Sequence, residues 1–184
     1  MSFSVRTLIL AALQCWLQLA CSHASIAAAA TESDLKAAYL INVLKLVHRK
    51  EPPADRGSMT LCLVAAGTLE QSMRAVEGSI IGGRKLKLLI LRRDSEMRGC
   101  EAIFLGRTAG LRSTMDRART LGLLTVGSDA DFIPMSGMIS LLVEGRKIVV
   151  EVNGDAIKTA DWVFSSHLLE VARMTRPGTA AWNR

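Results

Sequence analysis

The sequence predicts a single α/β domain, in which helices cover both faces of a mixed central sheet and a β-hairpin comes late in the chain. Between residues 60 and 129, short apolar runs alternate with segments whose apolar residues recur at helical spacing. Around Gly145 and Arg146, two segments alternate apolar and polar residues, as the strands of a hairpin do. The length of 184 residues suits one core of ordinary size and leaves too little chain for a second.

The expected elements follow one another in a definite order. A first helix is expected over residues 34–50, because apolar residues recur at helical spacing until Pro52 and Pro53, which cannot continue a helix. Each expected strand is a short apolar run bounded by glycine or polar residues. The later elements are a strand at 60–66, a helix from 68, strands at 86–91 and 99–106, a helix at 108–122, a strand at 123–129, the hairpin at 138–153, a short helix, a link at 162–164 and a last helix ending at 174.

Residues 1–27 are interpreted as a secretory signal peptide. Arg6 is followed by an almost wholly apolar stretch at 7–20 and then by small residues, which is the order of such a leader. The apolar stretch is shorter than the roughly 20 residues that a membrane-spanning helix needs. Cleavage is expected between residues 24 and 30; a lipoprotein signal acylated at Cys21 and a retained anchor helix are the alternatives. The domain is then expected at 32–175, with a loose tail at 176–184 and no membrane span in the mature chain.

Charge and composition argue against nucleic-acid binding. The formal net charge of +6 falls to +5 without Arg6, and basic residues are mixed with acidic ones along the rest of the chain. Nucleic-acid binding would favour a concentrated basic face with aromatic side chains for stacking, whereas only 4% of this sequence is aromatic. We interpret the charged residues as a solvated surface.

Two cysteines, Cys62 and Cys100, remain after the leader removes Cys15 and Cys21. Within its apolar run, Cys62 is most simply a small buried side chain. In an oxidising compartment, however, two cysteines allow one intramolecular disulfide. Closing that loop would stabilise the fold by about 4 kcal/mol in the chain-entropy description. Two unpaired thiols and an intermolecular bridge stay open as alternatives.

The sequence contains no evident catalytic or metal-binding constellation. The mature chain has two histidines, His48 and His167, and they match no metal-ligand spacing. Residues 126–131, “VGSDAD”, resemble the serine-bearing turn of hydrolases only loosely. No glycine-rich phosphate loop follows the first strand. From the residues alone we therefore expect no catalytic site, metal or cofactor.

Several segments form an ordered set that covers the whole mature chain. They are “LKAAYLINVLKLV” (35–47), “LCLVAAG” (61–67), “IIGGRKLKL” (80–88), “GCEAIFLG” (99–106), the long run 123–157 and “SSHLLEVARM” (165–174). The most specific part runs from “TVGSDADF” through “SGMI” and “EVNGDA” to “SSHLL”. This set resembles the YfiR-like (HmsC-like) periplasmic proteins. Unlike in many members, the first helix does not end in a tryptophan-bearing stretch before Pro52, and there is no second cysteine pair near the hairpin.

The resemblance implies a periplasmic regulatory domain, often a homodimer, that is not an enzyme. Such proteins bind the periplasmic part of an inner-membrane diguanylate cyclase and repress it, which lowers cyclic di-GMP, exopolysaccharide production and biofilm. The family's redox-sensitive cysteines correspond to Cys62 and Cys100. Their bond would stabilise the fold that binds the partner, and its reduction would weaken repression.

A small-ligand sensor or carrier is the alternative function. Ligands often bind beyond the strand ends of α/β sheets. Thr68, Ser128 and Asp129 follow expected strands and would lie near such ends. A secreted hydrolase is a weaker alternative, because no motif supports it.

Overall fold

A computed structural model describes residues 30–51, 57–92, 97–107 and 110–176. The predicted signal peptide lies outside the described residues, and so does the predicted tail beyond Arg176. Within the described part, no helix has both the length and the apolar character needed to cross a membrane.

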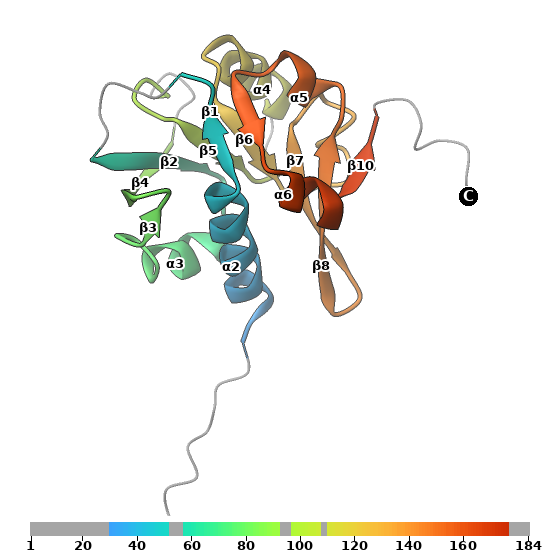
Figure 1. Cartoon of the computed structure of the whole chain (residues 1–184). Helices are drawn as coiled ribbons and strands as arrows, with labels where there is room; N and C mark the ends of the chain where they lie inside the picture. The colour runs from blue at the N-terminus through green and yellow to red at the C-terminus, as the bar shows by residue number, and fades with distance from the viewer. Residues whose placement is uncertain (1–29, 52–56, 93–96, 108–109, 177–184) are drawn as a thin grey trace, which may run out of the picture. The chain divides into compact units, whose positions relative to one another are not determined.

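One mixed sheet dominates the described structure (Figure 1). Its strands are β2 (Ser58–Val64), β3 (Ile80–Ile81), β4 (Arg84–Leu91), β5 (Ala102–Leu105), β6 (Leu124–Gly127), β7 (Ile139–Glu144), β8 (Lys147–Asn153) and β10 (Arg173–Thr175), in the spatial order β10-β8-β7-β6-β5-β2-β4-β3. The strands from β4 to β7 in this order are parallel, β7 and β8 form the predicted hairpin, and β10 pairs parallel with β8. β3 pairs antiparallel with β4 at the opposite edge. The predicted mixed α/β sheet with a late hairpin is confirmed.

Alternation along the strands divides the core into two layers. The helices are α2 (Glu32–Lys45), α3 (Leu69–Arg74), α4 (Leu111–Thr120), α5 (Ala156–Thr159) and α6 (Ser166–Val171). In β2, Leu61 and Leu63 belong to the layer packed by α2 and α3, whereas Cys62 belongs to the layer packed by α4. Because successive strand side chains point to opposite faces, a strand covered on both sides must be apolar throughout. Helices therefore cover both faces of the sheet, as predicted.

The start of α2 is fixed by a reciprocal cap. The Asp34 N–H donates to the Thr31 hydroxyl at 3.1 Å, and the Thr31 N–H donates to the Asp34 carboxylate at 3.0 Å. The Ser72 hydroxyl of α3 donates to the same carboxylate at 2.7 Å, so the cap also fastens α2 to α3. Hydrogen bonds from Ser72 and then from Thr31 hold the pKa of the Asp34 carboxyl below its ordinary value.

The first helix ends at Lys45, so its predicted extension to residue 50 is wrong. Residues Val47–Arg49 form a strand, β1, that pairs antiparallel with β9 (Trp162–Phe164), the segment predicted to be a link. The guanidinium of Arg49 lies 5.6 Å from the centre of the Trp162 ring, a cation–π contact. Pairing with a segment so distant along the chain overrides the helical periodicity, which reports only local spacing.

The last helix also ends earlier than predicted, at Val171 instead of residue 174. Ala172 has extended backbone (φ −86°, ψ 149°), and the next residues form β10. The guanidinium of Arg173 donates to Glu144 at 2.6 Å and to Glu151 at 3.0 Å, both on the hairpin. Its hydrogen bond holds the pKa of the Glu144 carboxyl below its ordinary value. These contacts attach the chain to the sheet edge, where it continues as a strand.

Gly106 lies where the chain after β5 passes against the end of β2. Its N–H donates to the Val64 carbonyl at 2.8 Å, and a Cβ added here would lie 1.9 Å from the Ala65 carbonyl oxygen. We expect Gly106→Ala to lower the free energy of unfolding in urea by about 2–3 kcal/mol, because backbone must move. Gly154→Ala is the matched control, since its Cβ would meet a Met174 methyl at an ordinary 3.5 Å. Equal stability of the two variants would contradict this packing.

Candidate functional site

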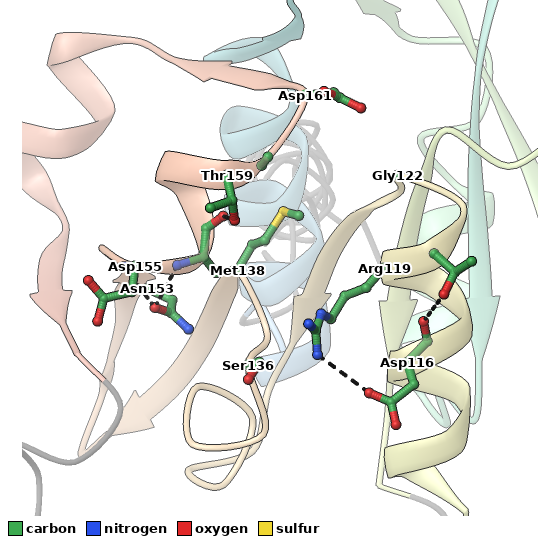
Figure 2. Close-up of a pocket in the computed structure, with 12 residues that line it drawn as sticks. Asp116, Arg119, Gly122, Ser136, Met138, Asn153, Asp155, Thr159 and Asp161 are labelled. Carbon is green, nitrogen blue, oxygen red and sulfur yellow. Dashed lines mark hydrogen bonds and ion pairs between the residues drawn. The ribbon is translucent and has the colours of Figure 1, made fainter.

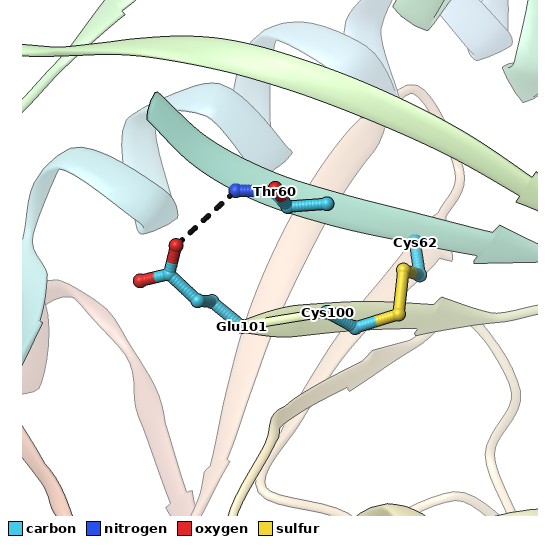
Figure 3. The surroundings of a disulfide bond; sticks show 4 residues. All are labelled: Thr60, Cys62, Cys100 and Glu101. Carbon is cyan, nitrogen blue, oxygen red and sulfur yellow. Dashed lines mark hydrogen bonds between the residues drawn. A yellow bond between two sulfur atoms is a disulfide. The ribbon is translucent and has the colours of Figure 1, made fainter. Parts of the chain in front are cut away.

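Cys62 and Cys100 form a disulfide in the core layer beneath α4 (Figure 3). Cys62 lies within β2 and is wholly buried, and Cys100 precedes β5 with 7% of its surface exposed. Their Cα atoms are 5.7 Å apart. The sequence is compatible with an intramolecular disulfide, two unpaired thiols or an intermolecular bridge. The structure contains the intramolecular disulfide.

The bond attaches a crossover connection to the centre of the sheet. β4 and β5 lie on either side of β2 and run parallel to it, so the connection between them links opposite sides of β2. Such connections usually contain a helix, but the described residues 97–101 contain none. Met97 is buried there, and its carbonyl accepts from the Cys100 N–H at 3.1 Å. The disulfide therefore holds the described end of this connection against β2.

The segment “TVGSDADF” is organised around the buried ring of Phe132. A Cβ at either Gly127 or Gly137 would lie 2.3 Å from this ring, so only glycine leaves the space that the ring occupies. Gly127 ends β6 and Gly137 precedes β7. The two glycines that flank the aromatic residue are the sequence signal for this arrangement, and our sequence analysis did not use it.

Asn153, within “EVNGDA”, ties the same segment to α5. Its side chain is buried, and its Nδ2 donates to the Gly137 carbonyl at 3.0 Å. Its Oδ1 accepts from the backbone N–H groups of Asp155 and Ala156 at 3.1 Å each. One amide thus connects the end of β8, the loop before β7 and the start of α5. Buried amides with satisfied donors and acceptors of this kind impose one local structure.

“SSHLL” has an equivalent role at the start of α6. The Ser165 hydroxyl accepts from the Leu168 N–H at 3.2 Å, which caps the helix. The Ser165 N–H donates to the Leu46 carbonyl at 2.9 Å, just after α2. The segments that carry the family resemblance are therefore structural joints between distant elements.

The Asn153 joint borders a hollow of about 590 Å³, shown in Figure 2. Asp116 and Arg119 come from α4, Ser136 from the loop before β7, and Asp155 and Asp161 from either side of α5. The hollow lies at the amino ends of β6 and β7. Three carboxylates and one guanidinium make its lining acidic, and the guanidinium lies 3.4 Å from the Asp116 carboxylate. Because the lining comes from widely separated segments, no local pattern in the sequence could reveal it.

The residues predicted to bind a ligand do not line this hollow. Thr68 borders a second hollow between α2 and α3, where its hydroxyl oxygen lies 2.6 Å from that of Ser33. Ser128 and Asp129 follow β6, and the Asp129 carboxylate lies 3.4 Å from Arg107. The three candidates therefore do not gather at one described site.

The described residues show no metal-binding cluster. No group of three histidine, cysteine, aspartate or glutamate residues among them is arranged to hold an ion. His48 and His167 are both exposed, on β1 and α6 respectively. The candidate site therefore consists of a buried disulfide and an open acidic hollow.

A family model described as YfiR/HmsC-like matches residues 33–173. The chain belongs to the YfiR/HmsC-like family. The match extends from the first turn of α2 to the start of β10, so it includes every joint described above. YfiR/HmsC-like proteins are periplasmic regulators of cyclic di-GMP signalling and are not enzymes. No match was found among curated proteins.

Solved structures share the fold of this YfiR/HmsC-like chain at low sequence identity. A conserved domain protein from Vibrio cholerae O1 biovar El Tor matches 79% of the chain with a TM-score of 0.52 and 10% identity. The ABC domain from Streptococcus pneumoniae, in complex with L-Trp, matches 73% with a TM-score of 0.51 and 8% identity. The chain spans 60% and 58% of the length of these two proteins. These similarities show the fold alone.

The Asn153 joint leads to a test on stability. Asn153→Ala removes the partners of buried backbone groups at Gly137 and at the start of α5. We expect the free energy of unfolding in urea to fall by about 3 kcal/mol, because buried backbone groups would be left without hydrogen-bond partners and without water. Asp155→Asn is the control, since that side chain is exposed. If Asn153→Ala is as stable as Asp155→Asn, the hydrogen bonds of Asn153 do not contribute to the stability of the fold.

Proposed function

We propose that this YfiR/HmsC-like protein represses an inner-membrane diguanylate cyclase by binding its periplasmic part. Repression would lower cyclic di-GMP and, with it, exopolysaccharide production and biofilm. The family match over residues 33–173 is the observation that carries the proposal. Export by a signal peptide at residues 1–27 belongs to the same proposal, because the partner domain lies in the periplasm.

The Cys62–Cys100 bond adds a redox response to the proposal. The bond is buried and joins β2 to the crossover, so its loss would loosen the centre of the sheet. The cysteines are 38 positions apart, and closing a loop of that length contributes about 4 kcal/mol in the chain-entropy description. Reduction would therefore lower the population of the fold that binds the cyclase, and repression would weaken.

Deletion of the gene in its native cell tests the proposed function. We expect cyclic di-GMP, measured by mass spectrometry, to rise in the deletion strain and to return to its original level with the wild-type gene. We expect Cys62→Ser/Cys100→Ser to restore it only partly, because its fold lacks the bond. Periplasmic abundance of each variant, measured by immunoblot, serves as the control.

Two results would count against this function. If deletion leaves cyclic di-GMP unchanged and no cyclase co-purifies with the tagged protein, the protein does not repress such an enzyme. If the double serine variant restores repression fully at equal abundance, the bond is structural and does not regulate the protein.

The acidic hollow favours a small-ligand sensor as a second candidate function. Its volume of about 590 Å³ is within the range of small-molecule sites.

L-Trp is the first probe of this hollow, because the pneumococcal protein of similar fold was solved with it. If the hollow binds this amino acid, the melting temperature should rise with L-Trp concentration, and less so in Asp161→Asn. L-Ala, which lacks the indole ring, is the control, and equal shifts with both amino acids would argue against a specific site.

A further inference from the structure

A largely buried ion pair involves Glu101, the residue after Cys100, and links three strands. Arg84, at the start of β4, donates from Nη1 to Glu101 Oε2 at 2.7 Å and from Nη2 to Oε1 at 2.6 Å. This two-pronged geometry is the strongest arrangement of an arginine with a carboxylate. The side chains are only 18% and 13% exposed. Nη2 also donates to the Ser58 carbonyl oxygen of β2, so the guanidinium joins β4, β2 and the residue before β5.

Glu101 directly follows Cys100 and is bound to the strand that carries Cys62. Its N–H donates to the Thr60 carbonyl at 3.0 Å, and its Oε1 lies 3.4 Å from the Thr60 nitrogen (Figure 3). Thr60 is two residues before Cys62 in β2. The position of Cys100 over Cys62 is therefore supported by contacts that do not involve sulfur.

The chain contains a similar ion pair that lies far from the disulfide. Glu70 and Arg74 pair at 2.8 Å on consecutive turns of α3, but their side chains are 36% and 55% exposed. Exposed pairs of this kind contribute little because water and salt screen them. The pair of Arg84 and Glu101 is better shielded and spans separate strands, so its loss should release a connection between them.

We propose that the Arg84–Glu101 pair is a latch that sets the redox equilibrium of the Cys62–Cys100 bond. With the latch closed, the reduced thiols stay opposed, and the effective concentration of one thiol at the other is high. With the latch broken, the turn at residues 97–101 moves away from β2 and the thiols separate. Arg84 and Glu101 are thus positioning residues. The inference rests on the redox part of the proposed function and does not require repression of a cyclase.

In the test reaction, glutathione disulfide is the oxidant that converts the two cysteine thiols into the disulfide. A cysteine thiolate attacks one glutathione sulfur, which breaks the glutathione S–S bond and forms a mixed disulfide. The second cysteine thiolate then displaces the remaining glutathione and forms the bond within the protein. The two cysteine protons end on the two molecules of reduced glutathione. Cys100 is the more exposed of the pair, so the first exchange occurs on the residue next to the latch.

The test measures this equilibrium in protein purified from the periplasm. Wild type, Glu101→Gln, Arg84→Lys and the control Glu70→Gln are equilibrated in buffers of varied glutathione ratio, quenched with acid and alkylated, and the oxidised fraction is measured by mass spectrometry. We expect the oxidation equilibrium constant to fall about tenfold in the two latch variants, equal to ~1.4 kcal/mol. We expect no change in Glu70→Gln, whose ion pair is exposed and remote.

Circular dichroism of each reduced variant separates positioning from folding. If Glu101→Gln is folded and its equilibrium constant matches that of the wild type, the proposal is overturned, even if its melting temperature is lower. If Glu101→Gln does not fold, Arg84→Lys decides, because it keeps the charge but cannot form the two-pronged contact. The readout does not involve cyclic di-GMP, so failure of the latch and failure of cyclase repression are separate outcomes.

Discussion

The burial of β2 on both faces is the constraint on which most of this structure depends. β2 lies between two parallel strands, so the chain must cross it to reach β5, and α2 and α4 must cover its opposite faces. Every side chain from Leu61 to Leu63 is wholly buried as a result. The described end of the connection from β4 to β5, residues 97–101, is attached to β2 by the disulfide to Cys62. A bond at this place acts on the centre of the domain.

The placement of the disulfide is what would let the proposed redox response reach the centre of the domain. A disulfide at a surface loop could be reduced with little effect on the rest of the domain, whereas this one joins the central strand to the connection that covers it. The ion pair of Arg84 and Glu101 reaches the same connection from β4. The disulfide and the ion pair therefore both attach the turn at residues 97–101 to neighbouring strands.

The motifs that carry the family resemblance have a different role from the one that their polar residues suggest. The side chains of Ser128 and Asp129 suggest a reactive site. The segment is instead built around Phe132 and the two glycines that make room for its ring. Asn153 then joins that segment to α5 through backbone groups. An acidic hollow borders the Asn153 joint, so this motif helps to shape a surface of the domain.

By itself the sequence determined the fold class and the late hairpin, because local periodicity encodes them. It also determined the family resemblance and the two cysteines, which short ordered motifs contain. Only the tertiary structure decided where α2 and α6 end, since β1 pairs with β9 and β10 pairs with β8 across long separations in the chain. It also decided that the bond holds a crossover, that Arg84 reaches Glu101, and that the hollow lies at the amino ends of the strands. These features depend on contacts between residues far apart in the sequence, which local spacing does not encode.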